Sequence, residues 1–202
     1  MLRTTGPMGG GCGMVMKPEP LFAALDQAKA DLPDATTLLL SPQGRRFDQE
    51  AARALSDTES LILVCGRYEG VDERFVDAGM DVEISIGDFV LTGGELGAMV
   101  IIDAVTRLIP GVLGNADSAG NDTFCDGLVE YAHYTRPALF NGEAVPDVLQ
   151  SGHHENIARW REETSLIRTV LKRPDLLENR ELSETERTVL MKWRQDLDRW
   201  LA

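Results

Sequence analysis

The strongest constraint on the fold is an alternation of short apolar runs with helical patterns between residues 17 and 111. The apolar runs are TTLLLSP (36–42), SLILVCG (60–66) and DVEISIG (81–87). The helical patterns occupy residues 17–33, 46–57, 72–79 and 94–111. Strands that alternate with helices in this way predict an α/β domain with a mainly parallel sheet.

Local signals predict where these elements begin and end. Pro33, Pro42 and Pro110 are expected to end the first helix, the first strand and the long apolar helix, because proline lacks a backbone donor. Asp48 is the expected N-cap of the helix at 46–57.

Three loops follow the predicted strands, and in parallel sheets ligands bind beyond the carboxyl ends of the strands. They are LSPQG (40–44), CGRYEGVDE (65–73) and GDFVLTGGE (87–95). The third loop is rich in glycine but has no lysine, so it is neither a P-loop nor a dinucleotide fingerprint. On glycine spacing alone, a plain tight turn before a helix remains the alternative.

Charge and cysteine usage limit the classes of function. The net charge is −13, so any RNA contact needs a local basic patch or contacts other than charge. The three cysteines form no C-x-x-C pair, which argues against a zinc site and fits a reducing cytoplasm. No signal peptide and no membrane-length apolar run is visible, so we expect a cytoplasmic protein without a membrane partner.

The composition changes after residue 113. We divide the chain into an α/β domain (1–113), a polar flexible linker (114–125) and a small helical C-terminal domain (126–202). Ser183 and Glu186 have the spacing of a capping box. The apolar stripes that carry Trp160 and Trp193 predict core packing, with base stacking as the alternative.

Five motifs, in one order and spacing, carry a family resemblance. They are PMGGGCGMVMKPEPL, LSPQGRRFDQE, LILVCGRYEGVDERF, SIGDFVLTGGELGAMVIIDAVTRLIPGVLGN and HYTRPALFNGEAVPDVLQSGHHENIARWR. Together they resemble the TrmD family of bacterial tRNA (guanine-N1)-methyltransferases, which belongs to the knotted SPOUT superfamily. The resemblance implies a deep trefoil knot in the α/β domain, a homodimer with a shared active site, S-adenosylmethionine and Mg²⁺ as cofactors, and tRNA as substrate.

The sequence departs from the family pattern in places. It begins near the family's glycine-rich loop, so we expect the family's first strand and first helix to be missing from the domain. Met8, Cys12, Phe89 and Gly97 stand where the family commonly has Tyr, Pro, Tyr and Pro. The missing segment and the negative charge leave a catalytically silent tRNA- or nucleoside-binding module as the alternative to the enzyme. Asp122 and the motif HYTRP argue against a third possibility, a knotted ribose 2′-O-methyltransferase.

The resemblance implies a cofactor site in the three loops. The implied residues are Leu40, Ser41, Pro42, Gly66, Tyr68, Glu69, Ile86, Gly87, Asp88, Phe89, Val90, Leu91, Gly93 and Gly94. S-adenosylmethionine has no phosphate, so a loop without lysine suits it. Apolar side chains and closely approaching glycine backbone suit its adenine. Taken alone, Glu69 is an ordinary solvated loop acid.

The resemblance also implies residues for the substrate and the chemistry. Asp122 matches the family's general base, and Arg107 its arginine at the end of the long helix. Without the motifs, Asp122 is a linker acid and Arg107 a charge that suits a helix C-terminus.

Further residues are expected to contact the substrate: Gly11, Gly13, Arg136, Arg168 and Lys172. The alternative for the basic residues is a salt-bridged, solvated helix face. Adjacent His153 and His154 point to different sides of a helix and do not make a metal pair. The Mg²⁺ ligands stay unknown.

Overall fold

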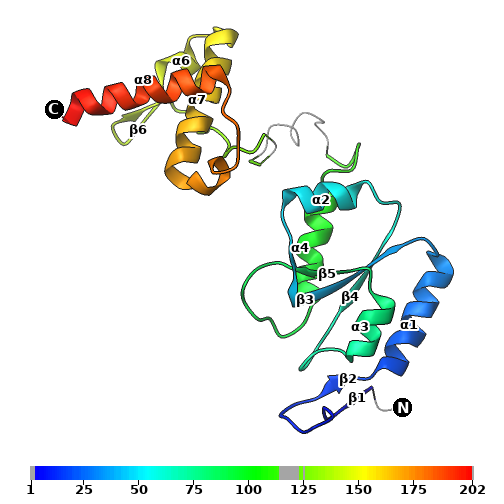
Figure 1. Ribbon diagram of the computed structural model, residues 1–202. Coiled ribbons are helices and arrows are strands. Elements are labelled where there is room, and N and C mark those ends of the chain that lie inside the picture. Colours follow the sequence, from blue (N-terminus) through cyan, green and yellow to red (C-terminus); the bar gives the residue numbers. More distant parts are fainter. Residues whose placement is uncertain (1–2, 114–122, 125, 202) are drawn as a thin grey trace. The chain divides into compact units, whose positions relative to one another are not determined.

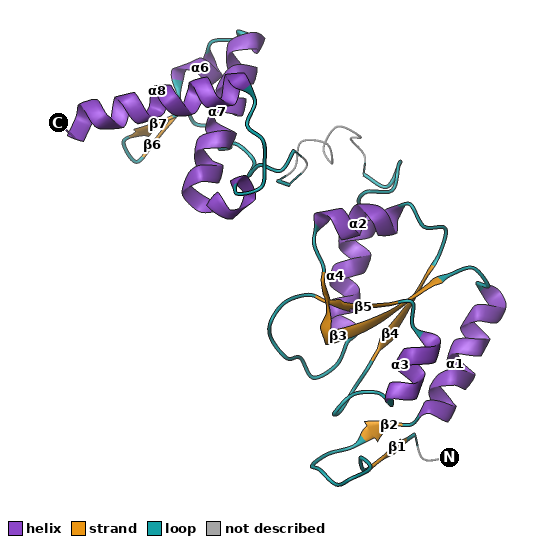
Figure 2. Cartoon of the chain, in the orientation of Figure 1, coloured by secondary structure: helices purple, strands orange, loops and turns teal. Residues whose placement is uncertain are grey.

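The computed structural model describes residues 3–113, 123–124 and 126–201. It divides into two compact units, residues 1–116 and 117–202, which we describe separately. The predicted linker lies outside the described residues except for 123–124. Figure 2 shows helices and strands mixed in the first unit. The elements of this unit are β1 (Thr4–Thr5), β2 (Val15–Met16), α1 (Pro18–Asp31), β3 (Thr36–Arg46), α2 (Gln49–Ser56), β4 (Leu61–Cys65), α3 (Glu73–Gly79), β5 (Val82–Ser85) and α4 (Glu95–Thr106).

The centre of the first unit is a three-stranded sheet in the order β4-β3-β5. Both pairings are parallel, with Leu38 opposite Leu63 on one side and Val82 on the other. The short N-terminal strands β1 and β2 form a separate antiparallel pair. The predicted α/β fold with a parallel sheet is therefore confirmed.

Helices pack on this sheet in two pairs, α2 with α4 and α1 with α3 (Figure 1). The main core lies where α2 and α4 meet the sheet. Its buried members are Leu38, Leu40, Ala52, Ile84, Ala98, Ile101 and Val105. In the other pair, the rings of Phe22 and Phe75 meet edge to face with centroids 5.0 Å apart. The core thus fixes the positions of the strands that lead into the three predicted loops.

The sequence signals for helix starts are confirmed. Asp48 Oδ1 accepts a hydrogen bond from the Ala51 amide at 2.9 Å, as an N-cap should. In the second unit, the Ser183 amide donates to Glu186 Oε2 (2.8 Å), and the Glu186 amide donates to Ser183 Oγ (3.2 Å). These two bonds are the reciprocal capping box predicted from the spacing.

The predicted end of the first strand at Pro42 is wrong, because β3 continues to Arg46. Pairing with β4 ends at Leu40, and pairing with β5 is irregular between Leu40 and Arg45. Pro42 lies in this irregular stretch, where no ladder bond needs its missing donor. The long helix α4 also ends earlier than Pro110, at Thr106, and the chain leaves it through a turn in which the Leu108 amide donates to the Val105 carbonyl.

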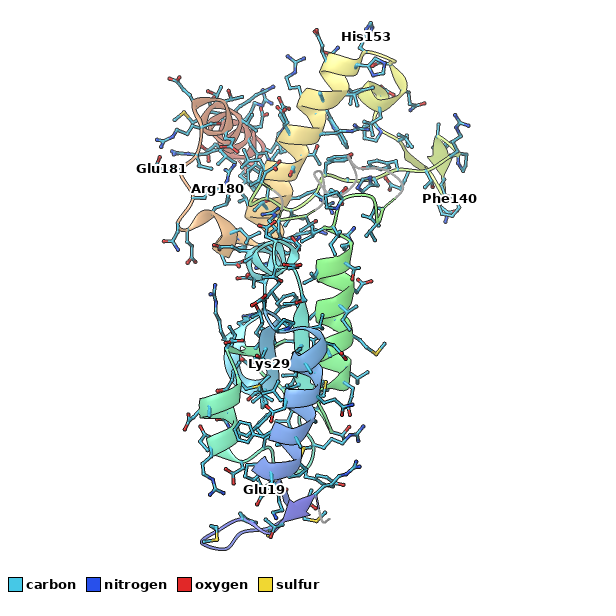
Figure 3. The ribbon with its side chains drawn as sticks, turned by 90° about the vertical axis from the view of Figure 1, so that its right-hand side faces the viewer. Glu19, Lys29, Phe140, His153, Arg180 and Glu181 are labelled. Atoms are coloured by element: carbon cyan, nitrogen blue, oxygen red, sulfur yellow. The ribbon has the colours of Figure 1, made fainter. Side chains whose placement is uncertain are left out.

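The second unit contains β6 (Leu139–Phe140), β7 (Glu143–Ala144), α6 (Asp147–Gln150), α7 (His154–Lys172), the 3₁₀ helix η1 (Pro174–Leu177) and α8 (Glu184–Leu201). Figure 3 shows Phe140 on the β6–β7 hairpin and His153 at the start of α7. The two helices predicted from apolar periodicity in this region are confirmed as α7 and α8. None of the helices in the described residues is long and apolar enough to cross a membrane.

Side chains of α7 hold the preceding extended segment. Thr169 is fully buried, and its Oγ1 accepts from the Val129 amide at 2.9 Å. Ser165 Oγ donates to the Val129 carbonyl. The predicted packing stripes are only partly buried: Trp160 is half-buried, while Leu171 and Trp200 are 65% and 69% exposed. Apolar periodicity therefore overestimated the packing of the last turns.

We expect Asp81→Ala to destabilise the first unit. The amide and the hydroxyl of the fully buried Thr37 both donate to Asp81 Oδ2 at 2.8 Å. Removing the carboxylate leaves these two donors without their acceptor, which should lower the free energy of unfolding by about 1 kcal/mol. The cost stays this small because Asp81 is exposed and water can accept part of the lost hydrogen bonding. Urea unfolding measures this cost, with the exposed Asp77→Ala of α3 as the control.

The same residue gives a pH dependence. The hydrogen bonds from Thr37 lower the pKa of Asp81 below its ordinary value of 3.8. The charged carboxylate therefore stabilises the fold above about pH 4, and this contribution is lost as the pH falls through the folded-state pKa. Between pH 7 and pH 3 the stability difference between the wild type and Asp81→Ala should shrink; a constant difference would contradict this assignment.

Candidate functional site

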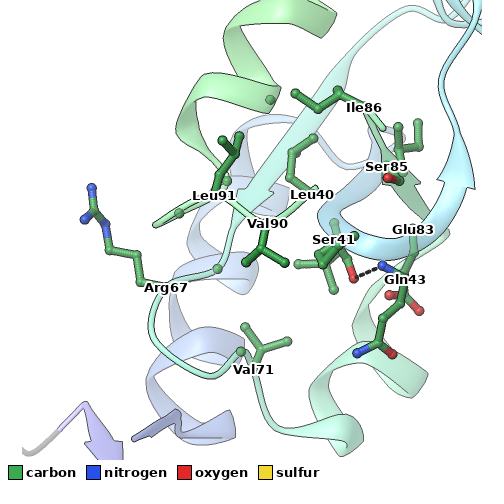
Figure 4. Close-up of a pocket in the computed structure, with 18 of the residues that line it drawn as sticks. Leu40, Ser41, Gln43, Arg67, Val71, Glu83, Ser85, Ile86, Val90 and Leu91 are labelled. Carbon is green, nitrogen blue, oxygen red and sulfur yellow. Dashed lines mark hydrogen bonds between the residues drawn. The ribbon is translucent and has the colours of Figure 1, made fainter. Parts of the chain in front are cut away.

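A cavity of about 410 Å³ lies at the carboxyl ends of the three parallel strands (Figure 4). The irregular part of β3 and the loops after β4 and β5 form its walls, at the end of the sheet where ligands bind in parallel sheets. The predicted cofactor residues that line it are Leu40, Ser41, Pro42, Gly66, Tyr68, Glu69, Ile86, Gly87, Phe89, Val90, Leu91, Gly93 and Gly94. Asp88 is the one predicted cofactor residue that does not line it.

The first wall is the irregular part of β3. Leu40 and Arg45 both stand opposite Ile84 of β5, so the residues between them bulge out of the sheet. The Gln43 amide donates to Ser41 Oγ at 3.2 Å and closes this bulge (Figure 4).

Gly44 is necessary for this bulge and was missed by the sequence analysis. A Cβ at Gly44 would lie 2.4 Å from the backbone nitrogen of Ile84, which no side chain can do. A glycine inside a strand often marks a bulge or a close backbone approach, but the sequence analysis placed Gly44 in a loop.

The second wall is the loop after β4, and it touches the glycine-rich N-terminal segment. Tyr68 has a positive φ of 63° and is 62% exposed. The Glu69 amide donates to the Met14 carbonyl at 3.0 Å. A Cβ at Gly13 would lie 2.4 Å from Glu69 Oε1. The structure therefore brings Gly13, predicted for the substrate, next to Glu69, predicted for the cofactor. Neither Gly11 nor Gly13 lines the cavity itself.

The third wall is the glycine loop between β5 and α4. The Gly94 amide donates to the Gly66 carbonyl at 3.0 Å. A Cβ at Gly94 would lie 2.8 Å from the Cα of Cys65 and 3.0 Å from the Cβ of Leu40. Gly94 thus lets the start of α4 approach the end of β4 closely. From this loop Val90 points into the cavity (Figure 4).

Gly93 lines the cavity beside a pair of charged side chains. A Cβ at this position would first meet the Glu95 carboxylate, at 2.3 Å, and the Cγ of Arg67, at 3.3 Å. A side chain at Gly93 would therefore displace the paired side chains of Glu95 and Arg67. At Gly94, in contrast, a side chain would collide with backbone atoms.

The charges around the cavity are mostly negative. Three carboxylates line it, those of Glu69, Glu73 and Glu83. Arg67 also lines it, but its guanidinium points away from the cavity in Figure 4, and its Nε donates to Glu95 Oε1 at 2.7 Å. No lysine is among the lining residues. Such a lining favours a cationic or neutral ligand over a phosphate.

Two pKa values are shifted beside the cavity. Hydrogen bonds from its own backbone amide and from Arg67 lower the pKa of Glu95, so this carboxyl is ionised at neutral pH. Burial, and then the charge of Glu95, raises the pKa of the Cys65 thiol. A protonated thiol is a poor nucleophile, so we assign Cys65 no chemical role; its side chain packs against the core.

The remaining predicted residues do not line this cavity. Arg107 is the half-buried C-cap of α4. Asp122 lies outside the described residues. Arg136 and Lys172 are exposed in the second unit. The half-buried Arg168 donates through Nε to the Glu130 carbonyl at 3.0 Å, so part of its role is structural.

In the part of the chain that the structure describes, no group of three or more His, Cys, Asp or Glu side chains is placed to hold a metal ion. We therefore assign no Mg²⁺ ligand among these residues, and no chemical step is derived through the ion.

Comparison with known proteins identifies relatives over most of the chain. Residues 4–179 match the family described as "tRNA (Guanine-1)-methyltransferase TrmD". The tRNA (guanine-N(1)-)-methyltransferase of Syntrophotalea carbinolica is 58% identical over 192 residues, which cover 95% of this chain and 77% of the relative. The protein of the same name from Geobacter sulfurreducens is 59% identical over 184 residues, 91% of this chain and 75% of the relative. The enzyme of the same name from Pseudomonas savastanoi is 55% identical over 193 residues, which cover 95% of this chain and 77% of the relative.

Proposed function

Because this chain belongs to the TrmD family of tRNA (guanine-N1)-methyltransferases, we propose that it transfers the methyl group of S-adenosylmethionine to N1 of the guanosine 3′ to the tRNA anticodon, position 37. The family membership makes the chain an enzyme of the methyltransferase type. The cofactor, the nucleotide position and a cytoplasmic location are part of the proposal.

The observation that carries the proposal is the chemistry of the cavity. Its volume of about 410 Å³ lies in the range of small-molecule sites. Ile86, Val90 and Leu91 offer apolar contacts to an adenine, and the backbone of the glycine-containing loop lies along the cavity. The lining carboxylates suit a sulfonium cation, and no lysine among the lining residues would repel it. When bound, S-adenosylmethionine supplies an electrophilic methyl group.

The chain's own residues would then prepare the guanine. N1 of guanine carries a proton at neutral pH, so a base must remove it before N1 can attack. We assign this role to Asp122. Negative charge then develops toward O6, and we assign its stabilisation to the guanidinium of Arg107. The glycine-rich segment with Gly11 and Gly13, which touches Glu69, is the proposed entrance for the guanine.

The assay that tests this function is methyl transfer from labelled S-adenosylmethionine to two tRNA transcripts that differ only at position 37. We expect transfer to the transcript with G37 and none to the one with A37. Nuclease digestion should then locate the label in 1-methylguanosine. Binding of S-adenosylmethionine and tRNA without any methyl transfer would favour the catalytically silent binding module. Label in a ribose 2′-O-methyl group would favour a knotted ribose 2′-O-methyltransferase.

We also propose the trefoil knot and the homodimer that the family resemblance implies. An apolar face of α4 supports the dimer: Leu96, Met99 and Val100 are 59%, 64% and 47% exposed. They lie on the side of α4 opposite the buried Ala98, Ile101 and Val105, and an exposed patch of this kind marks an interaction site. Light scattering at micromolar concentration should therefore give twice the mass of one chain.

A mixed dimer tests whether the active site is shared between subunits. Asp122→Ala and Arg107→Ala chains are each expected to be inactive as homodimers. If the two residues meet across the interface, mixing both chains restores one intact site and part of the activity. Mixtures as inactive as the separate variants would place both residues in a site built by one subunit.

The second unit is the proposed tRNA-binding domain, with Arg136, Arg168 and Lys172 as phosphate contacts. Because Arg168 also holds the Glu130 carbonyl, exposed Lys172 is the cleaner test. Lys172→Ala should weaken tRNA binding and reduce the slope of log affinity against log salt by about one. Exposed Lys192 of α8 is the control, and equal slopes for both variants would remove Lys172 from the phosphate contacts.

A further inference from the structure

A second cavity, of about 390 Å³, lies in the second unit between α6 and the first half of α7. The mechanism above does not use it. The residues that matter for its chemistry are Asp147, Ser151, Asn156, Arg159, Trp160 and Glu163. Its volume lies within the range of small-molecule sites, so a flat aromatic group such as a nucleobase fits.

One wall of this cavity is aromatic. Trp160 is half-buried and lines it. The ring of Tyr134 lies 6.3 Å from that of Trp160, centroid to centroid, and Tyr134 is 49% exposed. Outside the cavity lining, the guanidinium of Arg161, the residue after Trp160, lies over the Tyr131 ring at 4.8 Å. Aromatic rings interleaved with arginine are typical of surfaces that bind unpaired nucleotides.

The polar groups select against a phosphate. Arg159 Nη2 donates to Asn156 Oδ1 at 2.8 Å, so part of the arginine's hydrogen-bonding capacity is already used. The carboxylates of Asp147 and Glu163 flank the cavity and would repel a phosphate. They accept hydrogen bonds, and Asn156 keeps its amide donors. A neutral ring with donors and acceptors on its edge satisfies these groups, and guanine does so with N1–H, its amino group and O6.

We propose that this cavity binds one unpaired nucleobase of the substrate tRNA, stacked on Trp160 and hydrogen-bonded along its edge. The inference rests on the proposed function, because it takes tRNA as the substrate. The new element is that the second unit holds tRNA by base stacking as well as by phosphate contacts. It also changes the reading of Trp160 from a packing residue to a binding residue.

Two substitutions at one position test the proposal. Trp160→Leu keeps an apolar side chain but removes the stacking surface, and it should weaken tRNA binding about five- to a hundredfold. Trp160→Phe keeps a ring and should retain most of the affinity. Because stacking carries no charge, the salt slope should stay the same in both variants, and so should the affinity for S-adenosylmethionine. Circular dichroism checks that both variants are folded.

A fluorescence experiment gives a second, direct readout. The chain has three tryptophans, so Trp193→Phe with Trp200→Phe leaves Trp160 as the only one. Titration with tRNA should quench its emission and protect it from acrylamide. Unchanged emission at saturating tRNA, or equal tRNA affinity of wild type, Trp160→Leu and Trp160→Phe, would overturn the proposal. Equal weakening by Leu and Phe with unchanged emission would also overturn it, because Trp160 would then only pack.

These outcomes are separable from those of the proposed function. If tRNA binds with Trp160 stacked but no methyl group is transferred, the enzyme assignment fails and the cavity assignment stands. If methyl transfer is intact and Trp160→Leu binds tRNA like the wild type, the cavity assignment fails and the enzyme assignment stands.

Discussion

Replacing Asp122 with alanine is expected to lower the rate of methyl transfer about 10²- to 10⁴-fold, the usual contribution of a positioned general base. The reason is the proton on N1 of guanine, which blocks the lone pair that must attack the methyl group. The affinity for S-adenosylmethionine should not change, because the proposed cofactor residues lie in the loops of the first unit. Single-turnover methyl transfer with saturating cofactor measures the effect, and calorimetry measures the affinity.

Asp117→Ala is the matched control for this prediction, since Asp117 is another acid of the same polar segment. It should leave the rate within a factor of two or three of the wild type. The pH profile gives a further readout, because loss of the base should remove the rise in rate with pH that the wild type shows. Equal rates for the Asp122→Ala and Asp117→Ala variants would exclude Asp122 as the base.

Gly94→Val is expected to abolish measurable binding of S-adenosylmethionine and to destabilise the first unit by about 1–3 kcal/mol or more. A Cβ at Gly94 would lie 2.8 Å from the Cα of Cys65, and that backbone belongs to β4, which pairs with the central strand β3. The start of α4 must therefore move away from β4. This movement breaks the hydrogen bond from the Gly94 amide to the Gly66 carbonyl and pulls apart two walls of the cavity.

Gly6→Val is the matched control, because no atom lies within 4 Å of a Cβ built on Gly6 and its φ is not in the left-handed region. It should change neither the urea midpoint nor the cofactor affinity. Gly93→Val should lie between the two, since its Cβ meets the movable Glu95 side chain. Wild-type cofactor affinity in Gly94→Val would show that the cavity between these loops is not the cofactor site.

Most of the local structure could be predicted from the sequence. Apolar periodicity identified α7 and α8, and side-chain chemistry identified the Asp48 N-cap and the Ser183–Glu186 capping box. These features depend on residues within a few positions of each other, so a single sequence carries them. The alternation of strands and helices likewise predicted the parallel sheet, and with it the end of the sheet where ligands bind.

The family motifs predicted the lining of the cavity, with Asp88 as the residue that does not line it. They did not show why particular residues are needed. Gly44 and Gly94 are glycines because the backbones of Ile84 and Cys65 come close to them, and these partners are far away in the sequence. The sequence alone presents each as one more loop glycine.

The sequence by itself thus determined the main helices, the parallel sheet and the segments that carry the site, because short-range spacing and capping encode them. The short strands β1, β2, β6 and β7 were not predicted from it. Tertiary structure decided how β3 passes Pro42, which glycine tolerates no side chain, and that Gly13 touches Glu69. It also decided that Arg168 holds the Glu130 carbonyl and that Trp160 borders a cavity. Each of these depends on a contact between distant residues, and a long-range contact leaves no periodic trace in either of the segments that make it.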